Sequence, residues 1–223
     1  MNEKPAREYL CWKEEIITDL SDSNISNKYN DGFLFTRLGR GVMQQTRSCR
    51  IDLSRFELTS ENRRILKKTE GVELTAIGLP LRDGYDFKLG KLAKDFYDAK
   101  FGRGTMSANK VKELVADFTK SSFNSLLTYS NGDSPLGYTI CYHNKDLIHY
   151  SYPFYDLTTA PKDMGLGMMI RAVQYAKEAG LKYIYLGSLQ RPGDTYKLQF
   201  EGLEWFDGKG WRGDTGELKN VLK

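Results

Sequence analysis

Few side chains in this sequence could perform covalent or metal chemistry. The three cysteines, Cys11, Cys49 and Cys141, lie far apart in the chain and form no CxxC pair. The two histidines, His143 and His149, lie in a segment that reads as strand and turn. This pattern predicts neither a disulfide framework nor a zinc site nor a Ser-His-Asp triad. The expected chemistry therefore depends on carboxylates, tyrosines, backbone groups and an activated substrate, with no bound metal.

Two carboxylates and two tyrosines are the candidates for proton transfer and charge stabilisation. Asp156 lies at the end of an expected strand, and Glu201 follows Lys197 in the chain; either could act as a general base. The alternative for each carboxylate is a solvated cap. Tyr152 and Tyr185, expected on facing strands, could donate to an oxyanion or stack on an adenine. The alternative for both tyrosines is a place in the core.

A pair of glycines marks a possible anion site. Gly165 and Gly167 lie in the segment 162–168, between an expected strand and an expected helix. Backbone N–H groups at a helix N-terminus bind phosphate or carboxylate, and glycine lets an anion approach them closely. The alternative is that the glycines allow the helix to pack closely on its neighbours.

Basic residues are concentrated in one stretch of the chain. Residues 37–68 contain nine Lys or Arg and three Asp or Glu, whereas the net charge of the whole chain is only +4. Most of the nine are arginines, whose planar fork suits phosphate oxygens. We expect Arg50, Arg63, Arg64 and Lys67 to contact the phosphates of a polyanionic partner. The alternative is a solvated charged face.

Hydrophobic periodicity and capping residues predict the elements that must position these groups. The expected helices are 9–20, 62–68, 89–100, 107–119 and 166–179, with a surface loop at 21–30. The expected strands are a hairpin within 32–56, a strand at 72–81, a meander of 122–130, 136–143 and 147–155, and a strand at 182–186. The fold class is α/β (α+β), a mixed and mostly antiparallel sheet flanked by helices. We predict an N-terminal arm at 1–31, one domain at 32–206 and a C-terminal tail at 207–223.

The composition indicates an ordered globular protein. Hydrophobic residues make up 40% of the chain and charged residues 28%. No apolar run is long enough to span a membrane, and the N-terminus lacks the apolar core of a signal peptide. We therefore expect a cytoplasmic protein that makes no membrane contact.

Two motifs in the chain resemble those of arginyl-tRNA-protein transferases and the related bacterial leucyltransferases. The first is a strand that ends in Tyr185-Leu186-Gly187, followed by Pro192-Gly193 and by Lys197 three residues before an aromatic residue. The second is the Cys, Arg, Phe, Ser, Arg-Arg, Leu, Lys pattern of residues 48–68. The two motifs occur in the family's order, and with the helix between them they cover most of residues 33–206.

The resemblance implies a GNAT-like acyltransferase fold for residues 32–206. It implies transfer of an amino acid from charged tRNA to the N-terminal α-amine of an acceptor protein, as in the N-degron pathway. Arginine is the expected amino acid and leucine the second choice. Aminoacyl-tRNA is then a co-substrate, and no cofactor is needed because the ester is already activated. Lys197 falls on a family motif position, where it could pair with a phosphate or with the acceptor's carboxylate.

The sequence departs from the family in one feature and is also compatible with two other functions. The N-terminal cysteine cluster that holds a metal or iron-sulfur centre in arginyltransferases is absent, so no metal site is expected. The first alternative is an N-acetyltransferase that uses acetyl-CoA, with its pyrophosphate on the glycine turn. The second is an inert module that binds tRNA or a degron. We expect a monomer.

Overall fold

The structure is a computed structural model that describes residues 9–81 and 84–222. Its strands are β1 (Lys13–Ile16), β2 (Phe33–Phe35), β3 (Val42–Gln45), β4 (Ser48–Asp52), β5 (Glu73–Gly78), β6 (Ser125–Asn131), β7 (Ser134–His143), β8 (Leu147–Tyr155), β9 (Tyr183–Ser188), β10 (Leu203–Phe206) and β11 (Trp211–Arg212). Its helices are α1 (Asp22–Asn30), α2 (Ser60–Lys68), α3 (Phe87–Phe101), α4 (Ala108–Ala116), α5 (Met164–Glu178), the 3-10 helix η1 (Pro192–Gln199) and α6 (Thr215–Val221).

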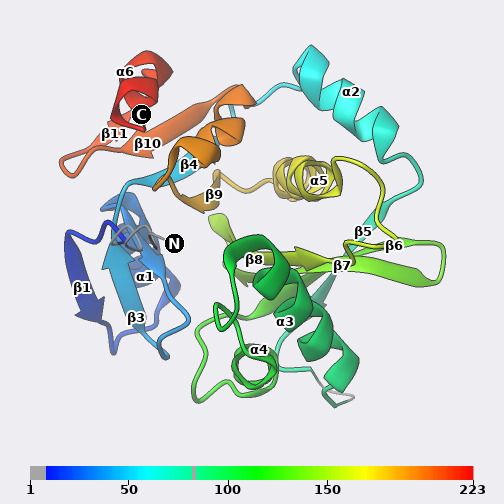
Figure 1. Cartoon of the computed structure of the whole chain (residues 1–223). Helices are drawn as coiled ribbons and strands as arrows, with labels where there is room; N and C mark the ends of the chain where they lie inside the picture. The colour runs from blue at the N-terminus through cyan, green and yellow to red at the C-terminus, as the bar shows by residue number, and fades with distance from the viewer. Residues whose placement is uncertain (1–8, 82–83, 223) are drawn as a thin grey trace, which may run out of the picture.

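Two sheets organise the chain. The larger sheet has eight strands in the order β11-β10-β4-β9-β8-β7-β6-β5, and the smaller has three in the order β1-β3-β2 (Figure 1). All neighbours in the larger sheet are antiparallel except β8 and β9, which are parallel. The predicted fold class, a mixed and mostly antiparallel sheet flanked by helices, is confirmed.

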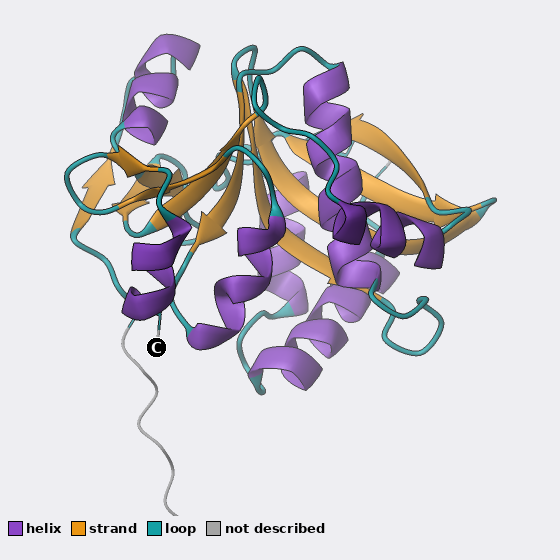
Figure 2. Ribbon diagram, turned by 90° about the horizontal axis from the view of Figure 1, so that it is seen from above, coloured by secondary structure: helices purple, strands orange, loops and turns teal. Residues whose placement is uncertain are grey.

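Helices cover both faces of the larger sheet, as Figures 1 and 2 show. On one face, α5 packs in a core that includes Leu127 and Tyr129 of β6, and α2 packs on α5. On the other face, α1, α3, α4 and the small sheet share a core with Leu126 of β6. Neighbouring residues of one strand thus enter opposite cores, because strand side chains alternate between faces.

Local signals predicted the middle of the chain correctly. The meander β6-β7-β8 and the unit β8-α5-β9 lie where alternation and turn residues indicated. Ser107 caps α4 by accepting from the Lys110 N–H at 3.1 Å, and Thr59 caps α2 through a reciprocal capping box with Asn62.

The N-terminal predictions are wrong for the described residues from 9 onward. The segment predicted as helix 9–20 contains strand β1, which pairs with β3, and the predicted loop 21–30 is α1. Ser21 caps this polar helix, which buries only Ile25 and Tyr29, four residues apart on one face. Two buried side chains in nine residues give too weak a periodicity to recognise. Residues 1–8 of the predicted arm lie outside the described residues.

The hairpin prediction is correct only in part. Strands β2 and β3 form it, but β4 leaves the small sheet and enters the large one between β9 and β10.

No helix among residues 9–81 and 84–222 is long and apolar enough to cross a membrane.

Candidate functional site

The two parallel strands of the large sheet separate near its centre. Their pairing ends at His149 of β8 and Tyr185 of β9. Beyond this pair, β8 continues to Tyr155 along β7, and β9 continues to Ser188 along β4. The backbone groups that face each other across this V-shaped gap therefore have no ladder partner there.

A bulge in each strand lies at the point of separation. On β8, Ser151 is the extra residue between the pairs that Tyr150 and Tyr152 make with β7. On β9, Leu186 and Gly187 occupy the irregular step against β4, and Gly187 has a φ of +80°. Such a conformation favours glycine, and bulges often redirect the chain beside active sites.

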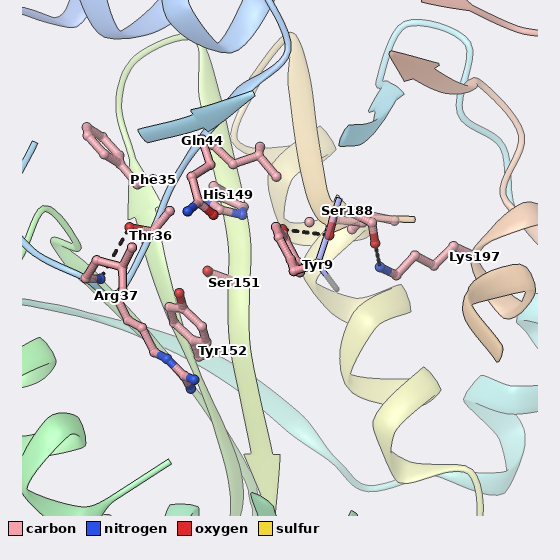
Figure 3. A pocket seen from close by; sticks show the side chains of 14 residues that line it. Tyr9, Phe35, Thr36, Arg37, Gln44, His149, Ser151, Tyr152, Ser188 and Lys197 are labelled. Atoms are coloured by element: carbon pink, nitrogen blue, oxygen red, sulfur yellow. Dashed lines mark hydrogen bonds between the residues drawn. The ribbon is translucent and has the colours of Figure 1, made fainter. Parts of the chain in front are cut away.

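Two cavities meet at this gap. The first has a volume of about 560 Å³, and Figure 3 shows it from close by. We name it the cationic cavity, because the described residues that line it include Arg37 and Lys197 and no carboxylate. It is lined by Tyr9, Leu34, Phe35, Thr36, Arg37, Leu38, Gln44, His149, Ser151, Tyr152, Leu186, Gly187, Ser188 and Lys197.

The second cavity has a volume of about 550 Å³ and is largely walled by rings. We name it the aromatic cavity, and its aromatic lining residues are Phe96, Tyr97, Phe101, Tyr150, Tyr152, Tyr155 and Tyr196. Two carboxylates also line it, and both already have partners. Asp163 accepts from Lys68 Nζ at 2.7 Å, and Asp194 accepts from the backbone N–H groups of Gln190 and Arg191.

Lys197 is at the junction and lines both cavities. Its side chain is buried, and its Nζ donates to the Ser188 backbone oxygen at 2.9 Å (Figure 3). Among the described residues it forms no salt bridge. An ammonium has three donors, so this buried cation can still bind an anion or a carbonyl oxygen at the junction.

His149 lines the same cavity as Lys197 and is neutral at physiological pH. Burial, with the charge of Lys197 as a second cause, lowers the pKa of His149 to about 3. Its Nδ1 lies 3.0 Å from the Tyr29 hydroxyl oxygen. An imidazole with this pKa is a poor proton acceptor but a usable hydrogen-bonding group.

The two candidate tyrosines have different surroundings. Tyr152 lines both cavities, and burial raises its pKa to about 12, so its hydroxyl is a protonated donor at the junction. Tyr185 lies in the core, where its ring packs edge-on against Tyr29 and its hydroxyl accepts from Arg50 at 3.2 Å. Of these two tyrosines, only Tyr152 lines the cavities that meet at the gap.

The two candidate bases lie away from the junction. Asp156 accepts from the backbone N–H and the hydroxyl of Thr158 at 2.8 and 2.6 Å, and these bonds lower its pKa. It lines a separate cavity beside α3. Glu201 is exposed in the turn after η1 and lines neither cavity of the gap. Asp156 thus has the geometry of a cap.

The nine cations of residues 37–68 do not form one surface, which corrects the expectation drawn from their spacing. Arg37 lines the cationic cavity, and Arg50 is buried in β4. The remaining cations of the stretch include those of α2, a helix that packs against α5. The chain crosses the molecule within this stretch, so neighbours in sequence are separated in space.

Arg50 has several partners inside the protein. Its Nε donates to Glu204 at 2.8 Å, and its Nη1 donates to the Asn30 side-chain oxygen and to the Tyr185 hydroxyl. Its guanidinium also lies 3.8 Å from the ring centroid of Tyr183 and 4.0 Å from that of Trp211. Its structural role is to hold β4, β9, β10 and β11 together.

The α2 cations differ in availability. Arg64 pairs with Glu61 and Lys68 pairs with Asp163, whereas the exposed Arg63 and Lys67 form no salt bridge with a described residue. Arg63 and Lys67 are therefore the cations of this helix best placed for an external anion.

The two glycines of the expected anion site have separate roles. Gly165 lines the aromatic cavity, where a Cβ would lie 3.2 Å from the Tyr155 ring. Gly167 faces α2, and a Cβ there would lie 2.7 Å from Thr69 Oγ1. For Gly167 the close-packing alternative fits the geometry.

Several residues at the gap were not predicted as site residues from the sequence. Ser151, Ser188 and Arg37 have no local pattern, since long-range pairing alone brings them together. Tyr9 reaches the cavity from the N-terminal segment, with its hydroxyl 2.9 Å from Ser188 Oγ. Among residues 9–81 and 84–222, no group of three or more His, Cys, Asp and Glu could hold a metal ion.

Part of the chain is similar in sequence to known proteins. A family model described as an acetyltransferase (GNAT) domain matches residues 93–198. The chain is 28% identical over 181 residues to a protein of Cereibacter sphaeroides named aspartate/glutamate leucyltransferase, covering 76% of this chain and 62% of that protein. It is 23% identical over 226 residues to one of the same name from Polynucleobacter asymbioticus, covering 96% and 89%.

The chain also has a limited similarity to a solved structure. L-PGS from Bacillus licheniformis matches with a TM-score of 0.46 and 15% identity, over 76% of this chain and 52% of that one. Residues 93–198 thus match the model of a GNAT acetyltransferase domain, and the chain has relatives named as leucyltransferases. It spans about 62% of the length of the first of these relatives.

Proposed function

We propose that this GNAT-fold chain transfers leucine from charged tRNA to the N-terminal α-amine of an acceptor protein that begins with aspartate or glutamate. One observation supports the proposal most directly: two cavities of different chemistry meet where the parallel strands separate. A transferase needs this arrangement, because donor and acceptor must reach one reacting carbon from different sides. Both relatives are named aspartate/glutamate leucyltransferase, and this name supplies the amino acid and the acceptor class.

The aromatic cavity suits the donor. Its rings offer apolar walls for a leucyl side chain and faces on which a terminal adenine can stack. An arginyl side chain would need a carboxylate, and Asp163 and Asp194 of this cavity are already engaged. A leucyl group is therefore favoured over an arginyl group as the group transferred. A transfer assay with Leu-tRNA and Arg-tRNA in parallel distinguishes these two donors.

The reaction needs little from the protein beyond orientation and charge stabilisation. The neutral α-amine attacks the ester carbonyl, a C–N bond forms, and the C–O bond to the terminal ribose breaks. The proton of the amine passes to the leaving ribose oxygen, directly or through water. Lys197 and the Tyr152 hydroxyl lie at the junction, where they can stabilise the oxyanion.

The cation at the junction also assists the nucleophile. A free α-amine has a pKa of about 7.7–8.0, and a nearby positive charge lowers it. Lys197 therefore favours the neutral, reactive form of the amine. This explains how the site can work without a carboxylate base, since both candidate carboxylates lie away from the gap.

The acetyl-CoA alternative meets an electrostatic obstacle. Its pyrophosphate would sit at the N-terminus of α5, where the Asp163 carboxylate lies beside Gly165 in the same cavity. Lys68 lowers the pKa of Asp163 and keeps it ionised. The Lys68–Asp163 pair offers no net positive charge to a pyrophosphate at this point, whereas the reacting end of an aminoacyl-tRNA brings no pyrophosphate to it.

A parallel transfer assay tests the proposal. The full chain is incubated with peptides that begin with Asp, Glu, Arg or Lys and with labelled Leu-tRNA, Arg-tRNA or acetyl-CoA. We expect label from Leu-tRNA on the Asp and Glu peptides. Label from acetyl-CoA alone would favour the N-acetyltransferase, and no transfer from any donor would favour the inert binding module.

A lysine variant with a matched control sharpens this test. Lys197→Met is expected to lower kcat by about 100-fold, the typical effect of losing an oxyanion donor. Lys145→Met removes the same charge at an exposed position and should leave kcat unchanged.

A further inference from the structure

Arg37 is a half-buried cation without an anionic partner in the described part of the chain. It lies between β2 and β3 and lines the cationic cavity. The contact that its Nη1 makes is to the sulfur of Met106 at 3.7 Å, a weak acceptor. It forms no salt bridge with a described residue. Partly burying a guanidinium without an anion is unfavourable, so this position suits an external carboxylate.

The charge of Arg37 reaches the junction of the cavities. Arg37 lies beside Tyr152 in Figure 3, and its charge offsets part of the rise that burial causes in the pKa of Tyr152 and Tyr97. Lys197 lies across the same cavity, and His149 between them is neutral. Among the residues that the structure describes, the lining of the cationic cavity therefore combines two positive side chains with no negative one.

We propose that Arg37 recognises the acidic side chain of the acceptor's first residue, an inference that rests on the proposed function. A volume of about 560 Å³ accommodates one or two residues of an extended peptide. With the α-amine at the junction beside Lys197, the side-chain carboxylate enters the cavity toward Arg37. The planar fork of Arg37 can bind both carboxylate oxygens, which gives discrimination against the neutral amides.

The test compares acidic acceptors with their amide analogues. Transfer is measured on peptides that differ only in a first residue of Asp, Asn, Glu or Gln, with saturating Leu-tRNA. We expect Arg37→Gln to lower kcat/KM by about 10- to 100-fold for the Asp and Glu peptides. The Asn and Gln peptides should change by less than about threefold, because an amide loses no ionic bond. Arg37→Lys should retain part of the preference for acid over amide.

Arg103→Gln is the matched control, since it removes an exposed arginine that lines neither cavity of the gap. It should leave the ratio of acid to amide unchanged. Equal losses for all four peptides in Arg37→Gln would overturn the proposal. A weaker affinity for tRNA with an unchanged ratio would also overturn it, and would make Arg37 a tRNA contact.

Peptide binding separates this inference from the proposed function. Fluorescence anisotropy of labelled Asp and Asn peptides is measured on the full chain without tRNA. Tighter binding of the Asp peptide by the wild type, lost in Arg37→Gln, would support acid recognition even if no leucine is transferred. Equal affinity of the wild type for the two peptides would refute acid recognition even if transfer occurs.

Discussion

Replacing Arg50 by alanine is expected to lower the free energy of unfolding by about 3–4 kcal/mol. The charge-assisted hydrogen bond to Glu204 contributes about 1.5–3 kcal/mol. The stacking of the guanidinium on Tyr183 and Trp211 adds about 0.5–1 kcal/mol for each ring. Arg55 lies 3.5 Å from Glu204 and keeps part of its pairing, which limits the total. Breaking a buried pair by removing one partner costs a comparable amount in other proteins.

Urea unfolding followed by tryptophan fluorescence measures this effect, and Trp211 reports on the network directly. With a slope of about 2 kcal/mol/M, the midpoint should fall by about 1.5–2 M. Arg50→Lys should recover little of the loss, because lysine has neither the fork nor the planar face. Arg63→Ala is the control, and its midpoint should match the wild type. A wild-type midpoint in Arg50→Ala together with weakened tRNA binding would refute the structural role and restore Arg50 as a phosphate contact.

Three further predictions follow from contacts in the structure. Gly167→Ala should lower the unfolding temperature, since its Cβ would lie 2.7 Å from Oγ1 of the buried Thr69; thermal unfolding followed by circular dichroism measures the loss, and an unchanged unfolding temperature would refute the close packing of α5 on α2. Stability should fall as pH drops from about 6.5 towards 5, because His149 is held neutral in the fold with a pKa near 3 but takes up a proton on unfolding. At pH 5 the loss is about 2 kcal/mol, and His149→Gln should show a shallower pH dependence of its urea midpoint. Arg63→Ala with Lys67→Ala should weaken binding of all tRNAs alike and reduce the slope of log affinity against log salt by about two, and an unchanged slope would exclude α2 from the tRNA surface.

The fold of the middle of the chain could be predicted because its signals are local. Alternating residues define β6, β7 and β8, and the caps Ser107 and Thr59 bond to N–H groups within the first turn of their own helices. The helix predicted for 9–20 failed because a strand as short as β1 is specified by its pairing with β3, which lies beyond any local window.

The candidate site was predictable only where a motif marked it. Lys197 was identified from its motif position, and the structure brings it to the junction of the two cavities. Arg37 was counted as one of nine cations and Ser151 was not identified at all. Asp156 and Glu201 have suitable chemistry, but their places in the fold leave them away from the gap.

The sequence by itself determined the composition, the total charge, and the order of helices and strands from α2 to β9, since the signals for these elements lie close together in the chain. Only the tertiary structure decided which cations are free to bind a substrate. Arg50 and Arg37 are both arginines within the same basic stretch of the sequence. Insertion of β4 between β9 and β10 surrounds Arg50 with partners, whereas Arg37 lines a cavity. The sequence does not reveal this difference, because the burial of each charge depends on strands that are distant in sequence.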